Sequence, residues 1–330
     1  TKRKFGINKT NEIMSENLDL IVKERAEKWL SDSYDEETRK KVYDAMEEIN
    51  YYPNEIARAL LNNRTYFVGV IVPTVTSPFH GEVVEQIEYY LSQKNYKMLL
   101  CNSKNQMDTE KAYIDMLRRN QVDGMIVGTH NAVVETYSKL KMPVVGIDRY
   151  LGEHIPVVSC DNYAAGQMAT RHLIDKGCQH ILCIRGNSKL KMPGNNRSQA
   201  YIQEMEKVGL PQMILEVPFI MENVEKQKLI YDMLNAHPEI DGIFAGDDSL
   251  AVIALHVARQ KGINIPKDLK IIGVDGTKQI LGFVPELTTI QQPVKQIAKV
   301  AVDKLIDLIE GKTAESCMDL PVKLLEGQTT

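Results

Sequence analysis

From residue 66 onward, short apolar runs alternate with stretches in which apolar side chains recur every three or four positions. The short runs are typical of strands buried on both faces, and the longer pattern is typical of amphipathic helices. This alternation predicts an α/β fold with doubly wound parallel sheets. Strands are expected at residues 68–72, 98–101, 124–127, 144–147 and 157–159, and again at 181–184, 214–217, 242–245, 270–274 and 288–290.

The strands fall into two series of similar length, which predicts two similar lobes. A helix predicted at 294–310 follows the second series and is expected to pack back on the first lobe. Residues 320–325 are expected to form one closing strand, and helices are predicted at 82–94, 109–120 and 166–176. The first lobe would comprise residues 66–162 and 293–321, and the second 163–292 and 322–330.

The pattern before residue 66 is helical throughout and predicts a separate headpiece at 1–52, clearest at 36–50. Residues 53–65 are expected to form a short helix and linker, because Asn54 can cap a helix whose apolar face includes Leu60. A helix of two turns is marginally stable by itself and needs a partner to order it. This segment is therefore a candidate switch element.

Composition adds constraints on class and compartment. With 330 residues, 43% hydrophobic and 25% charged, the chain is typical of a soluble protein of two or three domains. No apolar run approaches the roughly 20 residues that span a bilayer, and the first residues have no apolar core of a signal peptide. The five cysteines lack zinc or redox spacing, which favours free thiols in a cytoplasmic protein.

The net charge of −4 gives no general indication of nucleic-acid binding. Residues 1–65 contain 12 Lys and Arg against 13 Asp and Glu, so the headpiece is close to neutral. Duplex-binding domains normally concentrate positive charge, because phosphate contacts supply most of their non-specific affinity. The charge balance therefore counts against a simple DNA-binding headpiece.

Polar side chains collect where the predicted strands end, which is where open α/β folds bind ligands. Carboxylates, an amide and guanidinium groups beside an aromatic wall suit a polyhydroxylated ligand, because each hydroxyl can both donate and accept. An Asp after a strand is often only the cap of the next helix, so each residue alone has two readings. The candidate ligand-binding residues are Phe79, Asp148, Arg149, Arg197, Asp247 and Asp275.

Signatures of enzymes are few. The chain has no glycine-rich phosphate loop, no GxSxG elbow and no histidine spacing of a metal site. Asp247 and Asp248 could form an acid/base pair, but adjacent residues point apart. We therefore predict a protein with no catalytic residues, no metal and no cofactor.

An ordered set of motifs resembles the lactose-repressor family of bacterial transcription regulators. The motifs run from DEETRKKV at 35–42 and NYYPNEIARAL at 50–60 through VIVP at 70–73, SPF at 77–79 and VDGMI at 122–126 to GDDSLA at 246–251 and IGVDGT at 272–277. Together with LTTI at 287–290 they cover the chain from residue 35 to about 325. Among subfamilies, GTHN at 128–131, IDRY at 147–150 and SCDNY at 159–163 most resemble the sucrose-operon repressors of Gram-positive bacteria.

The resemblance implies a homodimer with a periplasmic-binding-protein-like core, a sugar or sugar phosphate between the lobes, and a helix-turn-helix headpiece on operator DNA. Its hinge helix would wedge a leucine into the minor groove and kink the duplex. Carried over residue by residue, the hinge contacts are Asn54, Ala57, Arg58 and Leu60. The sugar contacts are Phe79, Asp148 or Arg149, Arg197, Asp247 and Asp275.

Residues 9–30 depart from the family pattern. The expected turn glycine and the hydroxyl-rich reading helix are absent, and Glu16, Asp19, Glu24 and Glu27 would repel phosphate. Two functions stay open: a sugar-responsive repressor of a carbohydrate operon, or a sugar sensor that has lost operator binding. An enzyme on the same fold has only the cleft carboxylates in its favour.

A homodimer through the first lobe is also suggested by the helix predicted at 82–94. Its apolar positions, Val83, Val84, Ile87, Tyr90 and Leu91, offer more surface than one sheet face would cover. We therefore expect part of this helix to face a second copy of the chain.

Overall fold

The structure is a computed structural model that describes residues 36–48, 64–119, 122–131, 134–315 and 317–330. The chain divides into two compact units, residues 1–65 and 66–330. In the first unit the described part is helix α2 (Glu36–Glu48), at the place where the sequence predicts its clearest headpiece helix. The predicted hinge residues Asn54, Ala57, Arg58 and Leu60 lie outside the described residues.

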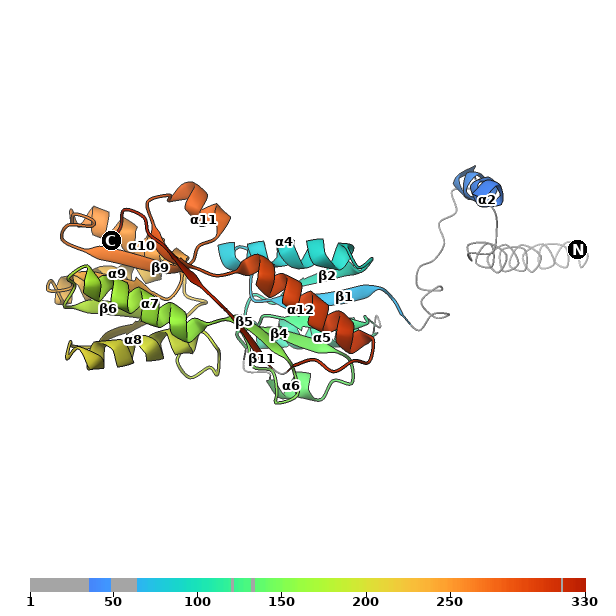
Figure 1. The fold of residues 1–330 in the computed structure, drawn as a ribbon, viewed down its shortest axis with the longest axis horizontal. Coiled ribbons are helices and arrows are strands. Elements are labelled where there is room, and N and C mark those ends of the chain that lie inside the picture. The colour runs from blue at the N-terminus through green and yellow to red at the C-terminus, as the bar shows by residue number, and fades with distance from the viewer. Residues whose placement is uncertain (1–35, 49–63, 120–121, 132–133, 316) are drawn as a thin grey trace, which may run out of the picture. The chain divides into compact units, whose positions relative to one another are not determined.

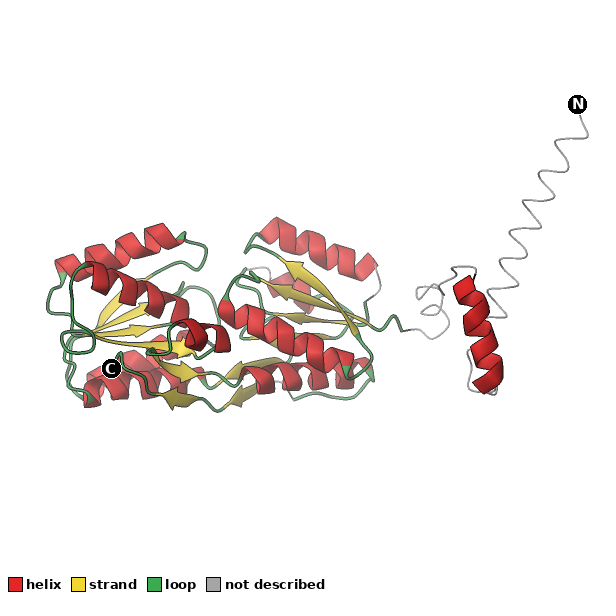
Figure 2. Cartoon of the chain, turned by 90° about the horizontal axis from the view of Figure 1, so that it is seen from above, coloured by secondary structure: helices red, strands yellow, loops and turns green. Residues whose placement is uncertain are grey.

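The second unit consists of two α/β lobes, each built on a six-stranded sheet (Figures 1 and 2). The strand order of the first sheet is β11-β5-β4-β3-β1-β2, and all its neighbouring strands are parallel. Its elements are β1 (Phe67–Val72), α4 (Pro78–Ser92), β2 (Lys97–Asn102), α5 (Met107–Arg119), β3 (Gly124–Val127), α6 (Val134–Ser138), β4 (Val144–Ile147), β5 (Val157–Cys160), α12 (Val294–Ile309) and β11 (Cys317–Leu320).

The second sheet repeats this order as β12-β10-β9-β8-β6-β7, and its strands are parallel except for β12, which runs antiparallel to β10. Its elements are α7 (Asn162–Asp175), β6 (Ile181–Arg185), α8 (Asn195–Lys207), β7 (Met213–Glu216), α9 (Asn223–Ala236), β8 (Gly242–Ala245), α10 (Asp248–Gln260), β9 (Lys270–Asp275), α11 (Lys278–Phe283), β10 (Thr288–Gln291) and β12 (Lys323–Leu325). The predicted two-lobed, doubly wound fold is confirmed.

Side chains on the two faces of strand β1 enter different cores, as the period of two along a strand requires. Val68 and Val70 pack with α4 and α12, whereas Ile71 packs on the other face with α5. In the second lobe, β6 divides its side chains in the same way between the α9–α10 layer and the α7–α8 layer. Both faces of each sheet are therefore covered, which explains why the strands read as continuous apolar runs.

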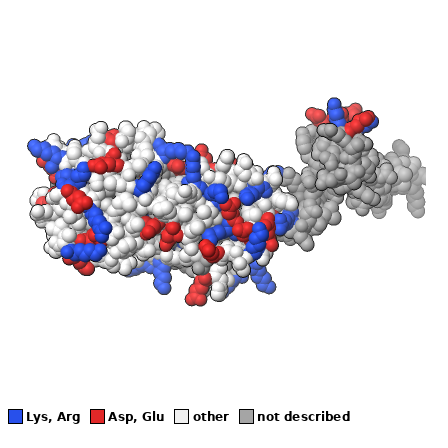
Figure 3. All heavy atoms as spheres, viewed as in Figure 1, with Lys and Arg blue, Asp and Glu red and all other residues white. Residues whose placement is uncertain are grey.

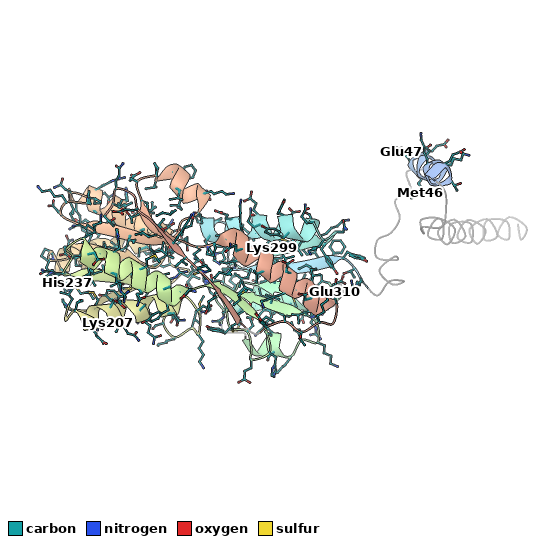
Figure 4. The ribbon with its side chains drawn as sticks, viewed as in Figure 1. Met46, Glu47, Lys207, His237, Lys299 and Glu310 are labelled. Carbon is teal, nitrogen blue, oxygen red and sulfur yellow. The ribbon has the colours of Figure 1, made fainter. Side chains whose placement is uncertain are left out.

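Helix α12 returns to the first lobe, as predicted, and lies beside α4 over one face of the sheet (Figure 1). Its buried residues include Ile297, Ala301 and Leu305. Figure 4 labels Lys299, which lies on the helix, and Glu310, which follows its last residue. On the face of the core in Figure 3, acidic and basic side chains are interspersed over both lobes.

The packing of α12 corrects the expectation for the predicted helix at 82–94. Val83, Ile87 and Leu91 are at most 2% exposed, because the sheet and α12 of the same chain cover them. Val84 and Tyr90 pack at the edge of the same core. The apolar face of α4 is thus used within the lobe and gives no argument for a dimer. The helix also begins earlier than predicted, with Pro78 in its first turn, a position that suits proline.

The prediction of one closing strand at 320–325 is wrong. The segment forms the end of β11, which pairs with β5 in the first sheet, and then β12, which pairs with β10 in the second. Pro321 lies between them and has no backbone N–H for a sheet ladder. Within the described residues, the chain therefore passes between the lobes after β5, after β10 and between β11 and β12.

Candidate functional site

A cavity of about 710 Å³ lies between the two lobes, at the edge where the strands of both sheets end. Both lobes line it. The first contributes Phe79 and Asp148, and the second contributes Arg197, Asp247 and Asp275. Its volume falls in the range of ligand pockets in proteins, roughly 300–1,000 Å³. Five of the six predicted residues, distant in sequence, therefore meet at one cavity.

Arg197 lies in the first turn of α8, where α7 packs closely against it. Gly166 of α7 permits this approach, since a Cβ there would collide with the backbone of Arg197. The guanidinium donates through Nε to Asn162 Oδ1 at 2.7 Å and through Nη1 to the Gly246 carbonyl at 2.6 Å. Nη2 also lies 3.9 Å from Cys160 Sγ. These contacts fix the direction in which the charged group faces the cavity.

Two of the carboxylates occupy matching strand ends in an unusual backbone conformation. Asp148 follows β4 with a φ of 49°, and Asp275 ends β9 with a φ of 129°. Positive φ is uncommon for residues other than glycine and is concentrated at functional sites. Asn162 Nδ2 lies 3.4 Å from Asp148 Oδ1, and Gln292 Nε2 donates to Asp275 Oδ1 at 2.7 Å.

Asp247 fits both of its predicted readings. Its side chain accepts the Leu250 N–H at 2.8 Å and so caps helix α10, and it also lines the cavity. Its neighbour Asp248 is turned away into the protein, where it accepts from the Gly276 N–H at 2.7 Å and the Thr289 hydroxyl at 2.6 Å. The two adjacent carboxylates therefore do not form an acid/base pair.

The carboxyl groups that line the cavity have raised pKa values. Burial raises the pKa of Asp148 and of Asp247, and it raises that of Asp275 well above its usual range, to which Asp248 adds. The charge of Arg197 opposes the shift at all three. Burial also raises the pKa of Asp248 to about 7. Carboxyl groups of this kind can accept and, when protonated, donate hydrogen bonds to hydroxyl groups.

An aromatic cluster forms another part of the cavity. The His130 ring lies edge-on to Phe219 with 4.4 Å between centroids, and His80 lies 5.6 Å from His130 and 5.4 Å from Phe79. Phe219 belongs to the second lobe, so this cluster spans the cleft. Burial lowers the pKa of His80 to about 3 and that of His130 to about 4, with smaller contributions from His130 and Arg149 respectively. Both rings are therefore neutral near pH 7.

Arg149, the sixth predicted residue, is not among the residues that line the cavity. It is 2% exposed, and its guanidinium donates to the carbonyls of Asn131 at 2.7 Å and Lys191 at 2.9 Å. His80, Phe219 and Gln292 also line the cavity, although the sequence did not predict them as site residues. Phe219 follows the end of β7 closely, so the strand-end rule could have found it, whereas His80 gives no comparable signal.

The described part of the chain contains no group of three or more His, Cys, Asp or Glu side chains that could hold a metal ion. None of its helices is long and apolar enough to cross a membrane. The five cysteines are free, and Cys317 is the exposed one.

Comparisons with known proteins match most of the chain. Residues 65–326 match the family described as periplasmic binding proteins and sugar binding domain of LacI family. The sucrose operon repressor of Pediococcus pentosaceus is 39% identical over 295 residues, which cover 89% of this chain and 90% of the relative. The ribose operon repressor of Halalkalibacterium halodurans is 34% identical over 295 residues, covering 89% and 88%.

A solved structure has the same fold. It is the periplasmic binding protein/LacI transcriptional regulator of Alkaliphilus metalliredigens in complex with D-xylulofuranose. The TM-score is 0.74 with 29% sequence identity, and the match covers 80% of this chain and 99% of that chain.

Proposed function

Because the chain belongs to the LacI family, we propose that it is a sugar-responsive transcriptional repressor of a carbohydrate-utilisation operon. The observation that carries the proposal is the placement of Arg197 among Asp148, Asp247 and Asp275 in the interlobe cavity. A buried guanidinium among carboxyl groups, with an aromatic cluster alongside, suits the hydroxyls and apolar faces of a sugar. The operon repressors that are 39% and 34% identical to it over 295 residues support the regulatory role.

We propose Phe79, Asp148, Arg197, Asp247 and Asp275 as sugar contacts. Arg185 and Lys226 line the cavity as well as Arg197, so a neutral sugar and a sugar phosphate are both candidate ligands. The protein would act as a cytoplasmic homodimer without catalytic activity. Sugar and operator would favour different arrangements of the lobes, so that each changes the affinity for the other by the same factor.

Operator binding is proposed to depend on the hinge residues Asn54, Ala57, Arg58 and Leu60, which lie outside the described residues. Leu60 would supply the wedge that offsets the cost of unstacking bases, a few kcal/mol per step. Leu60→Ala is therefore expected to weaken specific DNA binding strongly and to leave sugar affinity unchanged. Equal operator binding by this variant and by the parent chain would leave the segment with only a linker role.

The test of the function is a mobility-shift titration of the full chain on the DNA upstream of its own gene. It is run without sugar and with sucrose, ribose or glucose 6-phosphate. A shift that one of these sugars changes supports the proposal. DNA binding unaffected by any small molecule would contradict a sugar-responsive repressor.

The second candidate function is a sugar sensor that does not bind operator DNA. The near-neutral charge of residues 1–65 and the missing turn glycine favour it. Calorimetry with the same sugars, combined with the mobility shift, separates the two. Both candidates bind sugar, but a sensor gives no salt-dependent shift on DNA.

A further inference from the structure

Arg149 connects the two lobes. It follows β4 of the first lobe, yet one arm of its guanidinium reaches the Lys191 carbonyl, in the loop between β6 and α8 of the second lobe. The other arm donates to the Asn131 carbonyl of its own lobe. With the side chain almost fully buried, these hydrogen bonds are made away from competing water and are correspondingly strong.

Asn131 is held in turn by a buried glutamate. Glu110, in the first turn of α5, is fully buried and accepts hydrogen bonds from three side chains. They come from Asn131 Nδ2 at 2.6 Å, the Tyr137 hydroxyl at 2.7 Å and the Thr129 hydroxyl. Thr129 Oγ1 also accepts the Asn131 N–H at 3.1 Å. A buried carboxylate with three donors fixes the turn at 129–131.

That turn touches the second lobe through one residue and supports Arg149 through another. Its middle residue is His130, whose ring lies against Phe219 of the second lobe, and its last residue accepts from Arg149. Burial lowers the pKa of Arg149, and the nearby charge of Glu110 is the largest effect opposing this loss. Glu110 thus supports the geometry of the turn and the charge of the residue that crosses the cleft.

We propose that Glu110 is a positioning residue of the cleft, which through Asn131 and Arg149 fastens the first lobe to the Lys191 loop of the second. Glu110 itself touches no residue of the second lobe in the described network. This role rests on the proposed function in one respect: the two lobes that Arg149 connects enclose the proposed sugar site. Arg149 would then act on the arrangement of the lobes rather than on the sugar.

The alternative is that Glu110 merely stabilises the first lobe. The second lobe offers a matched control, Glu204, which is also buried and accepts from three donors: Gln167, Arg171 and Lys207. Its partners all lie on α7 and α8, so its network joins two helices of one lobe. Replacing either glutamate with Gln removes a buried charge, but only one replacement should affect the opposite lobe.

The experiment is hydrogen exchange of the sugar-free full chain, followed by mass spectrometry on peptides covering 187–195 and strand β6. In Glu110→Gln, exchange at 187–195 should accelerate on the order of tenfold, the loss expected for a charge-assisted hydrogen bond. Exchange in β6 should stay as in the parent chain. Glu204→Gln should leave 187–195 unchanged.

Two further variants keep the test decisive. Arg149→Lys retains the charge but lacks the fork that joins two carbonyls, so it should accelerate exchange at 187–195 while residues 110–119 stay protected. Should Glu110→Gln not fold, Tyr137→Phe, which removes one donor, is measured in its place. Acceleration confined to the first lobe, or equal acceleration in Glu204→Gln, would overturn the proposal. No sugar is present, so failure of sugar binding would count against the proposed function and not against this result.

Discussion

At matching strand ends, the two lobes bring different chemistry to the same cleft. The segments after β1 and β3 of the first lobe supply Phe79 and His130, whereas those after β6 and β8 of the second supply Arg197 and Asp247. The sheets nevertheless have the same strand order. A repeated scaffold thus presents a mostly aromatic and neutral edge on one side and a charged edge on the other.

The ends of β4 and β9 are the exception, because both carry an aspartate with positive φ. Each is joined to an amide side chain, Asp148 to Asn162 and Asp275 to Gln292. Both amides lie where the chain crosses between the lobes, after β5 and after β10. The two aspartates thus contact the crossover segments in the same way, whereas the aromatic edge and the charged edge differ between the lobes. The following predictions test this division.

The largest effect is expected at the charged edge. Arg197→Ala removes the guanidinium that balances three carboxyl groups, and the loss of a charged hydrogen bond of about 3 kcal/mol weakens binding by roughly 100-fold. Calorimetry with the sugar found active on DNA measures the change. Arg171→Ala, which removes an arginine on α7 outside the cavity, is the control and should bind normally. Equal affinities of the two variants would remove Arg197 from the site.

The aromatic edge should control the response of stability to acid. His80 and His130 have folded pKa values of about 3 and 4, below the unfolded value of about 6.5, so the unfolded chain binds more protons between these limits. Each histidine therefore contributes stability that is lost as the pH falls from 6.5 toward 4, by up to about 1.4 kcal/mol per pH unit.

The carboxyl groups with raised pKa act in the opposite direction over the same range, because the folded protein binds more protons there. Denaturant unfolding at several pH values should show that His130→Phe reduces the acid sensitivity of the free energy of unfolding. The exposed His256→Gln is the control. An unchanged slope in His130→Phe would mean that this ring is not held neutral by burial.

A smaller effect is expected where the second lobe contributes to the aromatic edge. Phe219→Ala removes the ring packed on His130, and the loss of an aromatic contact of about 1 kcal/mol weakens sugar binding by roughly fivefold. Phe283→Ala removes a ring of the same lobe that is 76% exposed and does not line the cavity. Titration of both variants should show a loss for Phe219→Ala alone.

The smallest effect separates the two roles of Asp247. Asp247→Asn keeps an equally good helix cap, so the free energy of unfolding should change by less than about 0.5 kcal/mol. Loss of the carboxyl group from the cavity should still weaken sugar binding severalfold. Unchanged sugar affinity, with lost stability only in Asp247→Ala, would show that this residue is a cap and nothing more.

The sequence by itself determined the strands and the edge at which the candidate ligand-binding residues gather. Buried parallel strands are local apolar runs, and the residues that follow a strand end lie at that edge, so Asp148, Asp247 and Asp275 could be found without coordinates. Arg197 could be found in the longer segment after β6. The wrong prediction of one strand at 320–325 also has a local cause. One apolar run that contains Pro321 supplies strands to two sheets.

Only the tertiary structure decided which of those residues face the cavity and which join the lobes. Asp148 and Arg149 are adjacent in sequence, yet one lines the cavity and the other reaches the Lys191 carbonyl. In the sequence, nothing distinguishes Glu110 from other polar residues near the start of a helix. Its role depends on three hydrogen-bond donors 19 to 27 positions away. Contacts of this kind arise from how distant segments pack, so residue spacing does not predict them.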